Sequence, residues 1–299
     1  MRRLDPLIVL IIGAVILAII APARGEFAEW FATATNVAIA LLFYLYGTRL
    51  SPAEALEGLK NWRLHLTILV FTFLVYPIIG LLLKPLGNGI LYLTLVPSTV
   101  QSSVAFTSIA RGNVPGAIVS ASASNLAGVV LTPLLVLLLM GGDFHVDAAV
   151  FLEISLILLA PFLLGQLTHR WVHVGTKIVD RGSIAMVVYS AFSAGVVGGI
   201  WDDMSAGHIA FLIAFSIALV AFMLWLTRFI SARLGFSRED QIAIEFCGTK
   251  KSLATGLPMA SVLFGTGPEL ALLVLPLMIY HQVQLMMCSW LAARYAKRP

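Results

Sequence analysis

Long apolar segments follow one another along nearly the whole chain, with only short polar stretches between them, and this pattern limits the possible folds most strongly. Hydrophobic residues make up 60% of the 299 residues and charged residues only 11%, whereas an ordinary soluble domain has roughly 25% charged residues. A soluble domain of this size needs a charged outer surface. Lipid as the surrounding solvent removes that need. The sequence therefore predicts one integral membrane domain, residues 1–299.

Apolar windows of about 20 residues, the length of a helix that crosses a bilayer, predict ten transmembrane helices. We place them near residues 6–22, 28–46, 63–83, 88–110, 114–140, 147–167, 183–201, 208–230, 240–264 and 269–292. The first run follows Arg2 and Arg3 and superficially resembles a signal peptide, but its length is nearly sufficient to span a bilayer. We expect an all-α membrane protein that keeps this run as its first helix.

The positions of Lys and Arg give an independent test, because cytoplasmic loops are enriched in these residues. With both termini inside, only Arg24 and Lys84 fall on the outer side, and Lys250 and Lys251 lie within the ninth helix. The other fifteen of the 19 are cytoplasmic: Arg2, Arg3, Arg49, Lys60, Arg63, Arg111, Arg170, Lys177, Arg181, Arg228, Arg233, Arg238, Arg294, Lys297 and Arg298. We expect a multi-pass protein of a bacterial inner membrane. No nucleic-acid partner is expected, because these residues are scattered over short loops.

Ten spans divide into two sets of five, and an odd number per set places the halves in opposite orientations, which is an inverted repeat. We place repeat one at residues 1–141 and repeat two at residues 142–299. Helix four carries the polar cluster Gln101–Ser103, and helix nine carries Lys250–Ser252. After each cluster, a Pro opens the next helix, at Pro115 and Pro268. Chance similarity between the two halves of the chain is the alternative explanation.

Two of the predicted spans contain features that a continuous lipid-facing helix does not tolerate. Glu245, Lys250 and Lys251 lie inside helix nine, where a charge near the bilayer centre costs a few kcal/mol or more. Helix four has Pro97 at the entrance of a polar stretch that ends at Ser103. We expect a break in both helices. Two broken helices that meet at mid-depth expose backbone N–H and C=O groups, which can bind ions or an anionic group.

The candidate substrate-binding residues are polar side chains at the two breaks and on the helices that follow them. They are Thr99, Gln101, Ser102, Ser103, Asn125, Thr249, Lys250, Lys251, Ser252, His281 and Gln282. A single Ser or Thr in a membrane helix more often contacts its own backbone or a neighbouring helix than a ligand. Residues such as Asn125, His281, Gln282 and Gln284 form interhelical contacts about as often as they line a site. The two lysines would instead reach an interface if helix nine were shifted.

Motifs for enzymatic chemistry are missing from the sequence. There is no HExxH, GxSxG or Walker loop, which argues against a metalloprotease, a serine hydrolase or a nucleotide-driven pump. We expect no enzyme, no cofactor and no bound metal. Any transport then runs on gradients.

The residues at the two breaks, 97–115 and 245–258, resemble the bile acid:sodium symporter family, and more specifically its SBF-like branch, which includes a yeast regulator of calcium homeostasis and its vertebrate relatives. The resemblance covers nearly the whole chain. Its most specific part is Cys-Gly-Thr-Lys-Lys-Ser-Leu-Ala-Thr-Gly-Leu-Pro at residues 247–258. It implies a core of helices three to five and eight to ten, with helices four and nine broken and crossing, and a panel of helices one, two, six and seven.

The resemblance also implies two sodium ions behind the crossing, but this chain has only part of the implied ligand set. Ser102 and Glu245 match. The other implied ligand positions carry residues of a different type, namely Ser103, Ala117, Ala121, Thr72 and Thr249. Because sodium needs several oxygen ligands, we expect these differences to weaken sodium binding greatly, which puts sodium coupling in doubt. We hypothesise that a Lys ammonium beside Glu245 replaces the cation, while the second Lys holds an anionic substrate. The ion-coupling candidates are Glu245, Ser102, Lys250 and Thr72, with the proton as a second possible coupling ion.

The sequence thus predicts a secondary-active or facilitative transporter of a small organic anion, working as a monomer or homodimer in the lipid bilayer. The resemblance implies a bile acid or sterol conjugate as the type of substrate. A regulator of calcium influx without transport of its own is the alternative that the resemblance leaves open.

Overall fold

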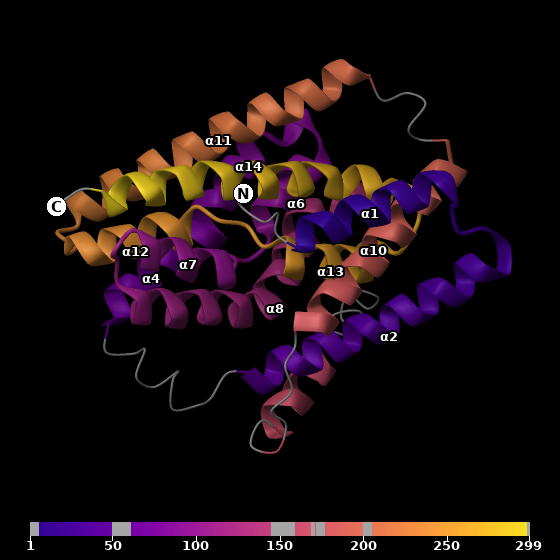
Figure 1. Cartoon of the computed structure of the whole chain (residues 1–299), viewed down its shortest axis with the longest axis horizontal. Helices are drawn as coiled ribbons and strands as arrows, with labels where there is room; N and C mark the ends of the chain where they lie inside the picture. Colours follow the sequence, from indigo (N-terminus) through magenta and orange to yellow (C-terminus); the bar gives the residue numbers. More distant parts are fainter. Residues whose placement is uncertain are drawn as a thin grey trace. The chain divides into compact units, whose positions relative to one another are not determined.

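The computed structural model of the chain describes residues 6–49, 61–144, 159–168, 171, 177–199 and 205–297. All regular elements in these ranges are helices. Figure 1 shows them in chain order, from indigo at the N-terminus to yellow at the C-terminus. Their bounds are α1 (Pro6–Ile20), α2 (Gly25–Arg49), α4 (Trp62–Val70), η2 (Phe71–Val75), α5 (Tyr76–Leu82), η3 (Lys84–Leu86), α6 (Asn88–Leu95), α7 (Gln101–Ile109), α8 (Val114–Phe144), α10 (Lys177–Val197), α11 (Ala206–Arg233), α12 (Arg238–Gly248), α13 (Leu253–Phe264) and α14 (Glu269–Ala296), with a further helix at Leu159–Thr168.

The all-α prediction is confirmed for the described residues. Five helical stretches are long and apolar enough to cross a membrane: Gly25–Thr48, Trp62–Leu82, Val114–Met140, Ala206–Arg233 and Glu269–Ala296. Three shorter apolar helices lie at Val9–Ile20, Leu159–Thr168 and Arg181–Val197. The count of ten spans stays a prediction, because residues 147–158 of the expected sixth helix lie outside the described residues. So do five of the expected cytoplasmic basic residues, Arg2, Arg3, Lys60, Arg170 and Arg298.

The helices depart most clearly from the predicted spans at two places. The helix expected at 183–201 begins six residues earlier, at Lys177. Its first turns contain Asp180 and Arg181, whose charges end an apolar window although they are tolerated at a helix terminus near an interface. The helix expected at 63–83 is interrupted by η2, one turn of π-helix at Phe71–Val75. Turns of this kind often occur at functional sites.

The chain forms two compact units, and each draws on both predicted repeats. The first comprises residues 1–51, 145–204 and 257–274, and the second comprises residues 52–144, 205–256 and 275–299. The first unit contains α1, α2 and α10, with α10 in contact with both α1 and α2. The single domain of residues 1–299, its repeats and its division into core and panel stay predictions.

Within the second unit, α12 is the central element. It contacts α11, α7, α4 and α8, and Figure 1 shows it beside α11 and α7. Its sequence starts with a helix-capping signal, because the Ser237 hydroxyl accepts a hydrogen bond from Asp240 N–H at 3.2 Å and Glu239 and Asp240 place negative charge in the first turn. The last seven residues of α12, 242–248, are all buried. The cap thus fixes the start of α12, and with it the position of the buried C-terminal end of this helix.

The two predicted helix breaks are confirmed. The first lies between α6, which ends at Leu95, and α7, which begins at Gln101. Pro97 accounts for it, since a Pro disfavours helical dihedrals at the preceding residue, and Val96 is extended with φ −77° and ψ 155°. The second break lies between α12, which ends at Gly248, and α13, which begins at Leu253.

Candidate functional site

The first break leaves the backbone of Ser98 without helical partners, and α8 supplies them. Ser98 N–H donates to the Ser124 hydroxyl at 3.1 Å. The Ser98 carbonyl accepts from the Asn125 side-chain amide at 2.7 Å. Two neighbouring polar residues of α8 therefore satisfy both backbone groups of one residue, which lets the break remain buried.

The second break is satisfied in the same manner by α14. Lys251 N–H donates to Gln284 Oε1 at 2.9 Å, and Gln284 Nε2 donates to the Lys251 carbonyl at 2.8 Å. The Thr249 carbonyl accepts from the Tyr280 hydroxyl at 3.0 Å and also from the Tyr76 hydroxyl. Each break thus has its own set of polar partners from helices outside it.

The two breaks also contact each other directly. Ser252 N–H donates to the Pro97 carbonyl at 2.7 Å, and the Ser98 hydroxyl donates to the Cys247 carbonyl at 2.6 Å. A third bond runs through Asn125, whose Oδ1 accepts from the Thr255 hydroxyl at 2.7 Å. Residues about 150 positions apart in the chain are in this way held together at one buried site.

The side-chain ammonium of Lys251 is enclosed by backbone oxygens. Its Nζ donates to the carbonyls of Thr72, Thr94 and Val96 at 2.9, 2.8 and 2.8 Å. It also lies 4.2 Å from the centroid of the Tyr76 ring, and the residue is 0% exposed. Three acceptors require three N–H donors, and only the ammonium form of Lys has three. The site is therefore built for a positive charge, which we call the Lys251 cage.

The carbonyls of the cage are available because helical hydrogen bonding fails at all three. In η2, Tyr76 N–H donates to the Phe71 carbonyl, five residues back. At the same spacing, the Thr72 carbonyl would accept from residue 77, but this residue is Pro77, which has no N–H. Thr94 and Val96 belong to the C-terminal end of α6, where carbonyls lack partners in their own helix. A π-turn, a Pro and a helix end together create the cage.

Lys250 lies beside aromatic rings instead of oxygens. Its Nζ is 3.9 Å from the centroid of the Phe106 ring and 5.7 Å from that of Phe246. The residue is 0% exposed, and among the described residues its Nζ has no hydrogen-bond partner. Cation–π contacts stabilise such a group by about 2 kcal/mol when it is desolvated, but a buried ammonium without an acceptor is costly. The Lys250 ammonium therefore lacks the acceptor that a buried charge requires among the described residues.

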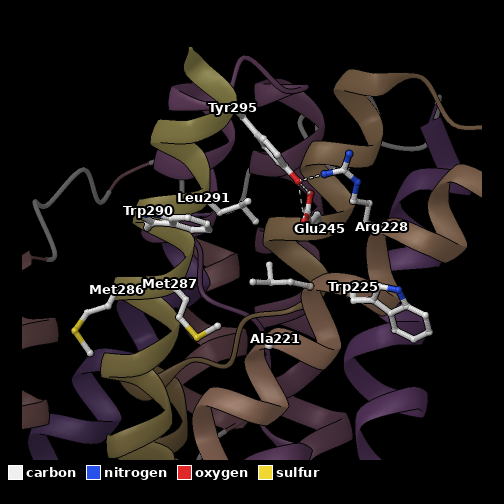
Figure 2. A pocket seen from close by; sticks show the side chains of 10 residues that line it. Ala221, Trp225, Arg228, Glu245, Met286, Met287, Trp290, Leu291 and Tyr295 are labelled. Atoms are coloured by element: carbon white, nitrogen blue, oxygen red, sulfur yellow. Dashed lines mark hydrogen bonds between the residues drawn. The ribbon is translucent and has the colours of Figure 1, made fainter. Parts of the chain in front are cut away.

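Glu245 is almost buried, at 3% exposure, and it pairs with a phenol rather than a lysine. The Tyr295 hydroxyl lies 3.1 and 3.0 Å from the two carboxylate oxygens of Glu245, and Arg228 donates to the same hydroxyl. Figure 2 shows this group at one end of a cavity of about 540 Å³. The cavity is lined by Ala221, Leu224, Trp225, Arg228, Glu245, Met286, Met287, Trp290, Leu291 and Tyr295.

Several of the sequence-predicted residues meet at the breaks. Thr72, Lys251, Thr249, Ser252 and Asn125 all take part in the contacts above. Ser103 donates to the Phe246 carbonyl at 3.3 Å, the hydroxyls of Thr99 and Ser102 are 2.5 Å apart, and His281 Nδ1 lies 2.9 Å from Gln284 Nε2. Gln101 is exposed at the start of α7, and Gln282 is half-buried.

The expected pairing of Glu245 with Lys250 is not observed. Within the described ranges, no ion pair joins Glu245 to either lysine. The reason is the helix geometry, because Glu245 lies inside α12 whereas both lysines follow its end at Gly248. Glu245 consequently contacts the C-terminal part of α14, and Lys251 contacts the end of α6.

Sequence reasoning missed the aromatic and backbone parts of the site. Tyr76, Tyr280 and Tyr295 contribute hydroxyls, and Thr94 and Val96 contribute carbonyls. A signal for Tyr76 was present, since it directly precedes Pro77 in the middle of a span. Carbonyl ligands have no side-chain signature, so only the two prolines, Pro77 and Pro97, pointed toward them.

Apolar helices of spanning length, together with two interrupted helices joined at buried polar groups, define an integral membrane transporter. The profile of the SBF-like CPA transporter family matches residues 5–297. The chain belongs to this family, which confirms the resemblance found in the sequence, and it is a transporter and not an enzyme.

Relatives of the chain support this assignment over nearly its full length. An uncharacterized protein of Pseudomonas aeruginosa is 47% identical over 96% of this chain and 92% of its own. The Putative symporter YfeH of Escherichia coli is 44% identical over 99% of this chain and 94% of its own. Sodium/bile acid cotransporter 7 of Danio rerio is 32% identical over 86% of this chain and 82% of its own.

Proposed function

We propose that this transporter carries a small organic anion and that Lys251 takes the place of a coupling cation. The observation that carries the proposal is the cage of three carbonyl oxygens around the Lys251 ammonium. Unwound backbone carbonyls and half-helix ends are the groups that bind coupling ions in transporters with broken helices. A covalently attached ammonium in such a position supplies the positive charge permanently.

The residues at the implied sodium-ligand positions support independence from sodium. Ala117 and Ala121 are fully buried and have no side-chain oxygen. The Thr72 hydroxyl donates to the Ile68 carbonyl at 2.8 Å, and the Thr249 hydroxyl lies 3.3 Å from that of Thr227. The two Thr hydroxyls keep oxygen lone pairs, but the two alanines supply no side-chain oxygen, so a sodium ion has fewer ligands than the resemblance implies.

The structure suggests roles for Lys250 and Lys251 that differ from the expected ones. We assign the role of the coupling cation to Lys251 in place of Lys250, because the Lys251 ammonium has three acceptors. Lys250 is the substrate-binding candidate, because an anion would provide the acceptor that its Nζ lacks. Glu245 is the candidate for proton coupling, since its carboxylate lines a cavity and is held by a neutral phenol.

The ten-helix inverted repeat belongs to this proposal. Support comes from the equivalent roles of Asn125 and Gln284, each of which satisfies the backbone at the break of its own predicted repeat. Each compact unit also contains residues from both halves of the chain, as expected when two repeats of opposite orientation intertwine. Relative motion of such halves would expose the breaks alternately to the two sides.

The substrate class follows from the helix N-terminus and the polar side chains at the first break. Gln101 is exposed at the N-terminus of α7, where unpaired N–H groups favour an anion. Thr99 and Ser102 place hydroxyls beside it. Since one relative is named Sodium/bile acid cotransporter 7, amphipathic anions such as bile acid or sterol conjugates are the first compounds to test.

Uptake by proteoliposomes tests the proposal, with labelled taurocholate as the first of a panel of organic anions. We expect the native protein to keep its uptake when choline replaces sodium. Lys251→Ala should lose uptake at least tenfold and regain part of it with propylammonium, which replaces the deleted atoms. Lys250→Ala should lose uptake without such rescue. Strict sodium dependence, unchanged in Lys251→Ala, would overturn the proposal, and altered calcium flux without uptake of any anion would favour the calcium regulator.

A further inference from the structure

The cavity at Glu245 has the form of a groove that is apolar along its length and charged at one end. It lies between α11 and α14, as Figure 2 shows. Its walls include Trp225, Met286 and Trp290, which are 57%, 65% and 62% exposed. In a helix that crosses a membrane, such side chains face lipid. The groove is thus open to the bilayer and reaches inward to a buried carboxylate.

The charged end of the groove holds Glu245 and Arg228, and Arg238, which does not line the cavity, lies over the Tyr295 ring. Among the residues that the structure describes, the Glu245 carboxylate accepts from Tyr295 alone, so it has acceptor capacity left. The guanidinium carbons of Arg228 and Arg238 lie 5.4 and 5.8 Å from the centroid of the Tyr295 ring. Across the described residues, neither Arg forms an ion pair with Glu245. The Tyr295 hydroxyl therefore stands between the Glu245 carboxylate and the Arg228 guanidinium.

We propose that this groove binds phosphatidylethanolamine. The lipid ammonium would donate to Glu245, and its phosphate would accept from Arg228 and Arg238, since guanidinium groups match phosphate geometry. One acyl chain would follow the walls formed by Trp225 and Trp290. The charge pattern selects this headgroup, because phosphatidylglycerol has no cation for the carboxylate and phosphatidylcholine has no N–H to donate.

The direction of the groove agrees with a lipid of the cytoplasmic leaflet. Arg228 lies near the end of α11, and Ala221 lies two helical turns before it, toward the middle of that helix. The distribution of Lys and Arg predicts that this end of α11 is cytoplasmic. Headgroup and acyl chain would consequently point the same way as in the surrounding bilayer. This inference shares Glu245 with the proposed proton coupling, but it is independent of the proposed substrate and of the role of Lys251.

Lipid-dependent thermal stability of the purified full-length protein in detergent tests the inference. Dioleoyl lipids with ethanolamine, choline and glycerol headgroups are titrated separately, and the unfolding midpoint is followed, because a ligand of the folded state raises it. We expect the ethanolamine lipid to raise the midpoint at about tenfold lower concentration than the choline lipid, as loss of one charge-assisted hydrogen bond predicts. Glu245→Gln should remove this difference.

Two alanines of α11 provide a matched pair of variants that leave the charges intact. Ala221→Trp fills the groove and should abolish the ethanolamine effect. Ala214→Trp is its control, because Ala214 is exposed on the same face of the helix two turns earlier and does not line the cavity. Equal stabilisation by all three lipids, a preference for the glycerol lipid, or an unchanged response in Ala221→Trp would each overturn the inference, even if Glu245→Gln failed to fold.

Discussion

The side chain of Gln284 forms two hydrogen bonds with the backbone of a single residue, Lys251. Oε1 accepts from Lys251 N–H at 2.9 Å, and Nε2 donates to the Lys251 carbonyl at 2.8 Å. Both partners are fully buried. The amide of Gln284 therefore replaces the helical neighbours that Lys251 lacks and fixes the direction in which its ammonium enters the cage.

Replacing Gln284 by Leu should destabilise the protein, because it leaves a buried N–H and a buried C=O without partners. We expect a loss of about 2 kcal/mol, given the modest strength of side-chain hydrogen bonds in membrane proteins. The unfolding midpoint in detergent measures it. Gln282→Leu is the control, since Gln282 is half-buried two residues earlier on the same helix. Equal midpoints for the two variants would show that Gln284 does not support the break.

Deleting the Lys251 ammonium should destabilise the fold in a way that a small cation repairs. Lys251→Ala leaves three carbonyl oxygens without donors, which we expect to cost about 3 kcal/mol. Propylammonium should recover part of the unfolding midpoint. The matched variant Lys250→Ala should show no recovery, because the ammonium of Lys250 has no oxygen cage to refill. Recovery of both variants, or of neither, would contradict the assigned difference between the two lysines.

The helical class and both breaks could be predicted because their causes are visible in the sequence. Apolar runs of spanning length mark the helices, Pro97 excludes helical dihedrals at Val96, and the charges of helix nine do not fit a continuous lipid-facing span. Asn125 was singled out as a polar residue in an apolar helix, and it does contact the first break. These features depend on local chemistry, which one sequence contains.

The detailed partners could not be predicted because they depend on three-dimensional packing. Glu245 and Lys250 are five residues apart, a spacing that suggested a pair, but the helix ends between them and directs the carboxylate to Tyr295. The three oxygens of the Lys251 cage belong to the backbone, so side-chain identity does not reveal them. The start of α10 was misplaced because charged residues in its first turns ended the apolar window.

Asn125 and Thr255 should show energetic coupling across the two breaks. The Thr255 hydroxyl donates to Asn125 Oδ1 at 2.7 Å, so Asn125→Leu and Thr255→Val each remove the same bond. In a double-mutant cycle we expect a coupling energy of about 1 kcal/mol, measured from unfolding in denaturant. A cycle of Asn125→Leu with Thr227→Val serves as control. Strict additivity of the first pair would mean that this bond adds nothing to holding the breaks together.

Gly47 and Gly165 make possible a close approach of two helices in the first unit. A Cβ on Gly47 would lie 2.0 Å from the Phe162 carbonyl oxygen, and a Cβ on Gly165 would lie 2.0 Å from the Tyr44 carbonyl oxygen. Atoms cannot approach so closely, and the obstacles are backbone, so the helices would have to separate. Separation would also stretch the 2.6 Å bond from Gln166 Nε2 to the Gly47 carbonyl.

Gly47→Ala should therefore lower the free energy of unfolding by about 2 kcal/mol, in the range of overpacked cores. Gly165→Ala should do the same, and the double variant should lose less than the sum, because once the helices have separated the second methyl meets no obstacle. Gly13→Ala is the matched control, since its Cβ would meet nothing within 4 Å and Ala is favoured over Gly in a helix. A midpoint in Gly47→Ala equal to that of Gly13→Ala would show that these two helices do not pack backbone to backbone.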